Sequence, residues 1–369
     1  MRILMTVPSL AREFGGPVGK AHSLATALRQ IGEDVVLVGV GTDDVPGVVS
    51  LGSFGRFHAT PVPSRFGPLR RAIRGADVVH VIGYRDPVGT AAAWQAQRRH
   101  VPYVLEPVGM VRPRMRSFAL KRGFDASLGR SVMHRAAAIV VASSVEAEDL
   151  ARAAVPDDRI RVRPNGVDFD GLLPLPARGV MRTKLGIPTD APLVVTLARI
   201  GAIKGLPVMA RSLRDLPGVW WLLAGPDERD GTLGAVYATL AAAGVADRAV
   251  IEPHGLWGND KRQALADADV FCLPSEYESF GTAALEAAGA GLPVVMTDRC
   301  GAKDVLDGRS FSHVRAGDPV QLATAIDRHI HTPQRPGELD DACGELRSRL
   351  DWRAVAATQM EIYSSSTRG

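Results

Sequence analysis

The stretch 193–213, LVVTLARIGAIKGLPVMARSL, followed by WWLLAG at 220–225, decides the fold. An apolar run rich in β-branched residues leads through a short loop into a helical pattern, and a second apolar run follows. Two buried strands joined by a helix are typical of a βαβ unit, in which the strands lie parallel. The stretch therefore predicts a parallel sheet covered by helices.

The same alternation extends over most of the chain. A first series has strands at 3–7, 35–40, 78–82, 103–105 and 138–142, with a helix at 19–32, and a second series has strands at 193–198, 220–225, 250–253, 270–274 and 292–297. Residues 165–192 between them are rich in Gly and Pro and predict an interdomain linker. We therefore expect an α/β protein with two Rossmann-like domains, residues 1–170 and 171–351, facing each other across a cleft.

Composition is that of a globular protein without a disulfide framework. The chain has 369 residues, of which 46% are hydrophobic and 23% charged, and its three cysteines are widely spaced. The first apolar run is too short for a signal peptide, so a cytoplasmic location is expected. Between 112 and 135 seven basic residues accompany one acid, Asp125. This run predicts contact with an anionic membrane rather than with nucleic acid, although a solvated helix face explains it equally well.

Two positions suit phosphate groups. Gly15, Gly16 and Gly19 precede or open a predicted helix, whose first amides would attract an anion. Arg199 and Lys204 follow a predicted strand and offer two cations for a pyrophosphate. A flexible turn and two surface cations are the plainer interpretations of these patterns.

The segment PSEYESFGTAALEAAGAGLP at 274–293 carries two carboxylates, Glu278 and Glu286. Ser279 is a predicted N-cap for a helix over 282–290, so the carboxylates lie on the order of 12 Å apart or less. The amides of Phe280, Gly281 and Thr282 would lie between them and point at phosphates. The spacing is close to the span of a sugar diphosphate.

Taken together, these motifs resemble retaining glycosyltransferases of family 4, which have the two-domain GT-B fold. The resemblance covers nearly the whole chain. It is carried by the pair Gly15-Gly16, VVHVIG at 78–83, PNGVD at 164–168, the Arg199 and Lys204 pair, LLAGP at 222–226, PHGLWG at 253–258, the two glutamates, and a terminal helix at 352–369 that would pack back on the first domain.

The resemblance implies a role for each position. Glu278 would contact hydroxyls of the donor sugar, Glu286 would hold the ribose, and Arg199 with Lys204 would grip the diphosphate. The implied donor site also includes Gly15, Gly16, Gly225, His254, Gly255, Leu256, Ser279, Phe280, Gly281 and Thr282. The implied reaction is metal-independent hexosyl transfer with retention, in which the leaving phosphate accepts the proton of the acceptor. No cofactor is expected beside the nucleotide-sugar.

One position departs from the family pattern. Many relatives have Pro-His-Gly-Met in the first domain, where this chain has Glu106 followed by Pro107-Val108-Gly109-Met110. Val108 cannot donate a hydrogen bond. Either Glu106 or another group such as His80 supplies the polar contact on the acceptor side, where Gly109 and Met110 also lie, or the chain is a subgroup variant with an altered acceptor or donor. A structural acid of the loop is the alternative interpretation of Glu106. The acceptor would be a glycan, a lipid-linked molecule or a small molecule, and the basic run 112–135 would face the inner side of the membrane.

Other functions stay open at this point. A nucleotide-sugar epimerase on the same fold needs no acceptor, and a binding protein with a degenerate site would fit the change at Val108. A metal-dependent transferase would need an Asp-x-Asp motif, for which Asp168 with Asp170 and Asp267 with Asp269 are candidates. The first pair begins in PNGVD and the second lies at a predicted helix end before a strand, so neither is placed where Mg²⁺ and a diphosphate would meet. An oxidoreductase is disfavoured because the dinucleotide fingerprint is missing.

Overall fold

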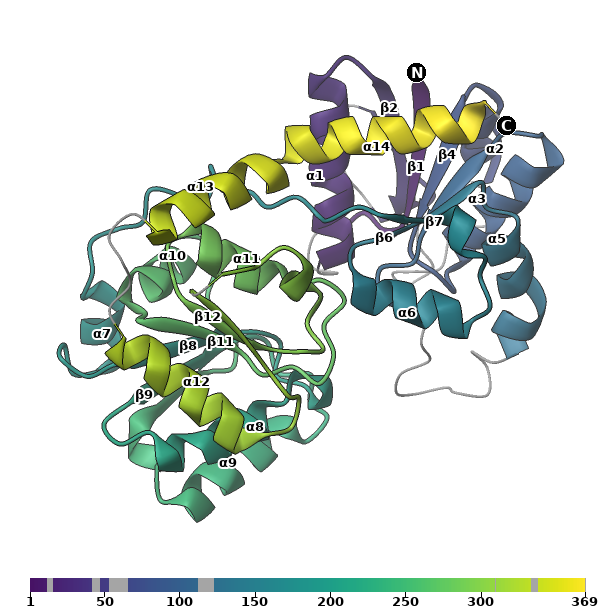
Figure 1. The fold of residues 1–369 in the computed structure, drawn as a ribbon. Helices are drawn as coiled ribbons and strands as arrows, with labels where there is room; N and C mark the ends of the chain where they lie inside the picture. Colours follow the sequence, from purple (N-terminus) through teal and green to yellow (C-terminus); the bar gives the residue numbers. More distant parts are fainter. Residues whose placement is uncertain are drawn as a thin grey trace. The chain divides into compact units, whose positions relative to one another are not determined.

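The computed structural model describes residues 1–11, 16–41, 47–52, 66–111, 123–308, 310–332 and 338–368. Contacts divide the chain into two compact units, Met1–Gly166 with Leu350–Gly369, and Val167–Arg349. The divisions expected from the sequence, at residues 170 and 351, lie within a few residues of these. Figure 1 shows that each unit contains one sheet with helices packed against it.

The described part of the first unit forms a seven-stranded parallel sheet of order β3-β2-β1-β4-β5-β6-β7. Its strands are β1 (Arg2–Ser9), β2 (Asp34–Val40), β3 (Val48–Ser50), β4 (Val78–Ile82), β5 (Tyr103–Glu106), β6 (Ala138–Val141) and β7 (Ile160–Val162). Its helices are α1 (Gly16–Gln30), α2 (Phe66–Arg74), α3 (Pro87–Arg98), α5 (Arg130–His134), α6 (Ser144–Arg152) and α14 (Trp352–Thr367), and a π-helical turn, Asp125–Gly129, precedes α5.

Side chains of this sheet alternate between two apolar layers. Ile3, Met5 and Val7 of β1 pack with α1 and α14, whereas Leu4 belongs to the layer under α2 and α3. Successive residues of a strand point to opposite faces, so an unbroken apolar run is what a sheet covered on both faces requires. The sequence run ILMTV therefore fits a central strand.

The last helix, α14, is part of the first unit. Asp351 caps it by accepting a hydrogen bond from the amide of Arg353, and Val355, Ile362 and Tyr363 are buried against the layer that contains α1. Figure 1 shows α14, in yellow, crossing α1 beside the first sheet. A side chain at Gly166 would come within 2.3 Å of the Trp352 ring, so the start of α14 fixes a glycine in the motif PNGVD.

The described part of the second unit contains a six-stranded parallel sheet of order β10-β9-β8-β11-β12-β13. Its strands are β8 (Leu193–Leu197), β9 (Trp220–Ala224), β10 (Ala249–Glu252), β11 (Val270–Leu273), β12 (Val294–Thr297) and β13 (Phe311–Val314). Its helices are α7 (Val180–Leu185), α8 (Leu206–Ser212), α9 (Thr232–Ala243), α10 (Gly258–Asp267), α11 (Thr282–Gly289), α12 (Pro319–His331) and α13 (Glu338–Leu350).

The predicted linker at 165–192 is wrong for most of its length. From Val167 onward the segment belongs to the second unit, and it contains helix α7. Phe169, Met181 and Ile187 are buried. Its few apolar residues are enough to anchor the segment to the second unit. Its Gly and Pro residues therefore form turns within that unit rather than a linker.

Candidate functional site

The loops after β8, β9 and β11 meet at the carboxyl edge of the second sheet. Gly225, directly after β9, donates its amide to Glu252 at 3.1 Å and lies against the loop after β8. A Cβ atom at Gly225 would be 1.8 Å from the carbonyl oxygen of Ala198. The backbone of these loops is therefore in direct contact, and only glycine fits at this position.

Lys204 and Glu278 form an ion pair at this edge. Lys204 ends a 3₁₀ turn, Ala202–Lys204, and its side chain is 11% exposed, while that of Glu278 is 20% exposed. The next residue, Gly205, has φ of 61°, and a Cβ atom there would be 2.0 Å from the carbonyl oxygen of Pro274. The structure thus brings together two residues that the sequence analysis placed in the site from separate motifs.

The backbone of Glu278 is fixed from both sides. Its amide donates to the carbonyl of Arg299 at 3.0 Å, and its carbonyl accepts from the amide of Gly301 at 2.9 Å. These bonds hold the main chain from which the carboxylate reaches Lys204. Such pre-positioning is what a ligand-binding carboxylate needs.

Helix α11 begins at Thr282, and its N-cap is Gly281 rather than Ser279. Gly281 is the N-cap with φ of 88°, and a Cβ atom there would be 2.6 Å from the sulfur of buried Cys300. The predicted cap at Ser279 is therefore wrong, although the helix itself is where it was expected. The carbonyl of Gly281 accepts from the amide of Ala284 at 2.9 Å, and no side chain of the cap residue covers the amides of Thr282 and Ala283 before it. These two amides of the helix start suit an anion. Phe280 is buried and Thr282 is exposed.

Glu286 lies in α11 and accepts a hydrogen bond from Lys261 of α10 at 2.9 Å. The two side chains are 19% and 28% exposed, so the pair is accessible from solvent. Lys261 was not predicted as a site residue, because nothing in the spacing of α10 distinguishes it from another surface lysine. A partner for Glu286 is visible only once two helices have been placed side by side.

Arg199 pairs with Glu228, which lies in the loop after β9. The Arg199 side chain is 60% exposed, and an ion pair so open to water contributes little to stability. The guanidinium is therefore available to another anion. Glu228, like Lys261, was not predicted.

His254, Gly255 and Leu256 follow β10 on the same edge of the sheet. His254 is exposed, and its backbone forms an isolated antiparallel β-bridge with Pro226. Gly255 has φ of 81°. The indole nitrogen of Trp257, 69% exposed, donates to the carbonyl of His254 at 3.3 Å. Leu256 is partly buried.

In the first unit, Glu106 is the centre of a buried charge cluster. Its carboxylate pairs with Lys20 of α1, lies 2.7 Å from an Arg163 guanidinium nitrogen, and lies 3.2 Å from Nε2 of His80. Burial raises the pKa of Glu106, but Arg163 and Lys20 outweigh burial and hold that pKa well below its usual range. Burial lowers the pKa of His80, whose Nδ1 lies 2.6 Å from the hydroxyl of Tyr363 in α14.

This cluster corrects the prediction that Glu106 or His80 reaches a substrate. Both side chains have 0% exposed area, and both face partners inside the unit. The expectation came from the family pattern, in which Val108 replaces a His and another polar group was needed. The sequence does not show that Lys20 and Arg163 cover the Glu106 carboxylate. In the structure they are internal groups that connect α1, β4, β5 and α14.

Val108, Gly109 and Met110 form the loop after β5. Val108 and Gly109 both have positive φ, 53° and 71°. This conformation is unfavourable for a β-branched residue, so Val108 is strained. The loop is held by Glu146, which accepts hydrogen bonds from the amides of Gly109 and Ala142. Gly16 opens α1, and Gly15 lies outside the described residues.

The two Asp-x-Asp candidates serve local structure. Asp267 and Asp269 both accept hydrogen bonds from Arg182, at 2.8 Å from its amide and 2.9 Å from its guanidinium. Asp168 accepts from the amide of Gly171 at 2.9 Å. Among the described residues no group of three or more His, Cys, Asp or Glu side chains is arranged to hold a metal ion.

Comparison with known proteins identifies the family. Residues 178–346 match the model described as glycosyl transferases group 1, and residues 15–166 match the glycosyl transferase 4-like domain. The D-inositol 3-phosphate glycosyltransferase of Xylanimonas cellulosilytica is 30% identical over 356 residues, which is 88% of this chain and 84% of the relative. The chain belongs to the glycosyl transferases group 1. It is therefore a glycosyltransferase of the family 4 type.

Solved structures show that this glycosyltransferase has the GT-B fold. Anabaena Alr3699/HepE in complex with UDP-glucose matches with a TM-score of 0.79 at 16% identity, over 99% of this chain and 100% of that one. Sucrose-phosphate synthase from Thermosynechococcus elongatus matches with a TM-score of 0.75 at 20% identity, over 99% and 98%. The described part of the glycosyltransferase has no helix long and apolar enough to cross a membrane.

Proposed function

We propose that this glycosyltransferase moves a hexosyl group from a nucleotide-diphosphate sugar to an acceptor, with retention of configuration and without a metal ion. The observation that carries the proposal is the edge of the second sheet, where Lys204 meets Glu278 near the start of helix α11. Arg199 and Glu286 add a cation and a carboxylate from neighbouring elements. The complex of Anabaena Alr3699/HepE with UDP-glucose supports a nucleotide-sugar donor.

The chemistry of the donor suits these groups. Breaking the bond between sugar and phosphate builds positive charge on the sugar and negative charge on the departing diphosphate. Arg199, Lys204 and the first amides of α11 would stabilise the diphosphate as it leaves, and such fixed groups act most strongly where charge develops. Glu278 would bind hydroxyls of the sugar, and Glu286 those of the ribose.

The ion pairs of the two glutamates bear on how the acceptor loses its proton. Retaining glycosidases use a nucleophilic carboxylate and an acid–base carboxylate. Here Glu278 and Glu286 are each paired with a lysine, Lys204 and Lys261. We therefore propose that the leaving phosphate takes the proton of the acceptor, and that the glutamates position the donor.

The acceptor is proposed to be a glycan, a lipid-linked molecule or a small molecule, in the synthesis of envelope polysaccharide or glycoconjugates on the cytoplasmic side of the membrane. The relative named for D-inositol 3-phosphate supports a small acceptor. The basic run 112–135, proposed to touch an anionic membrane, lies for its first eleven residues, 112–122, outside the described part of the chain.

Thermal shift with UDP, GDP, ADP and their common sugars, with and without EDTA, tests the donor and the metal together, because a bound ligand raises the unfolding temperature. A shift with one nucleotide that EDTA leaves unchanged is expected. Lys204→Ala and Glu286→Ala should abolish that shift, while Lys184→Ala, which removes an exposed lysine paired with Asp260, should keep it. Normal shifts and normal turnover in both site variants would refute the assignment. Release of nucleotide without any acceptor would instead favour an epimerase, and binding without turnover a degenerate site.

A further inference from the structure

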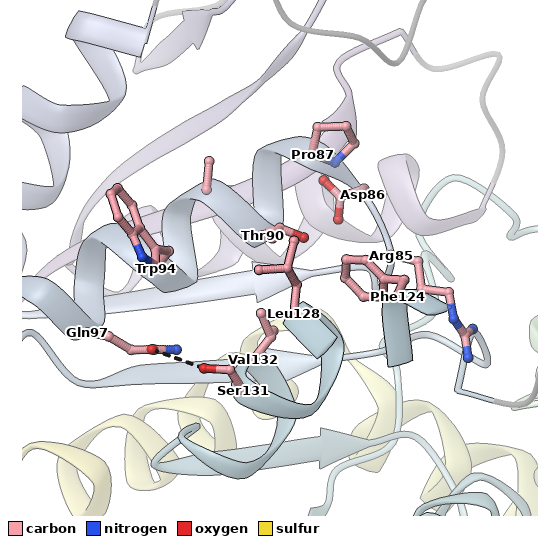
Figure 2. A pocket seen from close by; sticks show the side chains of 11 residues that line it. Arg85, Asp86, Pro87, Thr90, Trp94, Gln97, Phe124, Leu128, Ser131 and Val132 are labelled. Atoms are coloured by element: carbon pink, nitrogen blue, oxygen red, sulfur yellow. Dashed lines mark hydrogen bonds between the residues drawn. The ribbon is translucent and has the colours of Figure 1, made fainter. Parts of the chain in front are cut away.

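Two tryptophans in the described part of the chain are exposed to water, and their surroundings differ. Trp94 of α3 is 48% exposed and lies at an apolar cavity of about 460 Å³ in the first unit, as Figure 2 shows. The Arg98 guanidinium lies 4.6 Å from the centre of the Trp94 ring, so one face of this indole already has a partner. Trp257, which precedes α10 in the second unit, is 69% exposed, and none of the described residues stacks a ring or a guanidinium on it. A single exposed apolar side chain is common on protein surfaces, so its position decides what it can do.

The Trp257 side chain is held by the loop after β10. Its indole nitrogen donates to the carbonyl of His254 at 3.3 Å, and a Cβ atom at Gly255 would lie 3.2 Å from the same nitrogen. The loop is joined in turn to the loop after β9, because the amide of Asp227 donates to the carbonyl of Pro253 at 3.1 Å. The one polar atom of the indole is thus used within the loop. What the side chain can offer a ligand is its aromatic surface.

Trp257 lies next to the position proposed for the ribose of the donor. Lys261, four residues further along the chain in α10, donates to Glu286 of α11 at 2.9 Å, and Figure 1 shows these two helices side by side. Side chains four residues apart on a helix have Cβ atoms roughly 5–6 Å from each other. On its other side, the loop that carries Trp257 forms a β-bridge from His254 to Pro226, in the loop after β9. The ring is therefore at the edge of the sheet where the nucleotide is proposed to bind.

A nucleobase is the part of the donor that an aromatic surface at this place would meet. The base is bonded to C1′ of the ribose, the carbon next to the one that carries the 2′-hydroxyl. If Glu286 binds the ribose hydroxyls, the base lies within a few bonds of them. Every base has a flat π surface, and an aromatic side chain on which it stacks strengthens binding without selecting one base.

We propose that the nucleobase of the donor stacks on the Trp257 ring. The inference rests on the proposed function, because it takes the ribose to be at Glu286. It deepens that function, since the stacked ring adds affinity for each nucleotide and leaves the choice among bases to the groups at the edge of the base.

Isothermal titration calorimetry of the full chain with UDP, GDP and ADP measures the contribution of the ring. Stacking of ordinary strength predicts that Trp257→Ala weakens binding of the nucleotide roughly five- to hundredfold. Trp257→Phe should lose far less, because Phe keeps an aromatic face although it lacks the N–H that reaches His254. Trp94→Ala removes the exposed tryptophan of the first unit and should bind the nucleotide like the parent chain. Circular dichroism checks that each variant is folded.

Fluorescence gives a second measurement, which a purely structural role of Trp257 would not change. The chain has five tryptophans, and a base stacked on an indole quenches the emission of that indole. The nucleotide that binds should therefore quench the emission of the parent chain. In Trp257→Phe most of this quenching should be lost while calorimetry still detects binding.

Three results would overturn stacking on Trp257 and leave the proposed function intact. The first is equal nucleotide affinity in the parent chain and in Trp257→Ala. The second is a loss in Trp257→Phe as large as that in Trp257→Ala, which would assign the effect to the bond with His254. The third is unchanged quenching in Trp257→Phe, which would assign the signal to another tryptophan. If the parent chain binds none of the three nucleotides, the proposed function is refuted and this inference with it.

Discussion

Replacing Glu106 with Gln should destabilise the first unit strongly. The exposed fractions of the Lys20, Glu106 and Arg163 side chains are 7%, 0% and 1%, so the carboxylate balances two cations that water hardly reaches. Gln keeps the shape but removes the charge. Breaking a buried pair on one side costs about 3–5 kcal/mol, because the remaining charge stays buried without its partner. We expect a loss of that size in the free energy of unfolding.

The loss of unfolding free energy in Glu106→Gln should become smaller as pH rises. Burial already lowers the pKa of Lys20 from its ordinary 10.5, and Glu106 raises it in part. Without the carboxylate the folded variant releases this proton at a lower pH, while the unfolded chain keeps it up to the ordinary value. The unfolded state then binds more protons, so the stability of the variant increases with pH toward about 10.

Urea unfolding of the full chain at neutral and alkaline pH measures both effects. Lys20→Met and the double variant complete a cycle, in which the double variant should lose clearly less than the two single losses added together. A loss below about 1 kcal/mol for Glu106→Gln, or additive losses, would refute the account of the cluster. Turnover destroyed with stability unchanged would restore the direct role that the sequence suggested for Glu106.

Three further changes test single features of the structure. Burial raises the pKa of Asp86 to about 6, above its unfolded 3.8, so folding loses stability as pH rises through that range. Asp86→Asn, which keeps the cap, should therefore gain up to about 3 kcal/mol over the parent chain between pH 4 and pH 7, and an advantage independent of pH would contradict this. Gly225→Ala should cost about 1–3 kcal/mol because its Cβ meets the Ala198 carbonyl, whereas Gly234→Ala, with open space in α9, should cost nothing in the same thermal unfolding assay. Val108→Gly should be more stable than Val108→Ala by about 1 kcal/mol, the reverse of the usual order, and equal urea midpoints would show that the loop is not strained.

The fold could be predicted from the sequence because each central strand has a continuous apolar run. Strands β1, β4, β8 and β11 are buried on both faces, so their apolar runs stand out, and their observed bounds lie within two residues of the predicted ones. The strands that escaped prediction, β3, β7 and β13, are edge strands of the two sheets. An edge strand pairs on one side only, and short segments such as VVS or IRV gain their structure from the neighbouring strand.

The residues of the candidate site could be predicted only where the pattern of their own segment indicates them. Arg199, Lys204, Glu278 and Glu286 follow strands or lie in a helix that the pattern locates. Their partners Glu228 and Lys261 come from other loops and helices, and no spacing within one segment points to them. Pairing between elements is a property of packing, so it appears only in three dimensions.

The same limit explains why the burial of Glu106 was not foreseen, whereas the structure leaves Glu278 accessible, as a ligand-binding role would require. Both follow or end a strand at a carboxyl edge, and both have a lysine partner. The difference is a third group: Arg163 joins Lys20 at Glu106 and both seal it from water, whereas Glu278 and Lys204 keep 20% and 11% of their side chains exposed. A carboxylate held by two buried cations is neutralised within the fold. In an accessible pair such as Lys204 and Glu278, a ligand can instead offer its phosphate to the lysine and its hydroxyl groups to the carboxylate. Accessibility of the ion pair, more than its presence, separates the proposed binding edge of the second sheet from the structural cluster of the first.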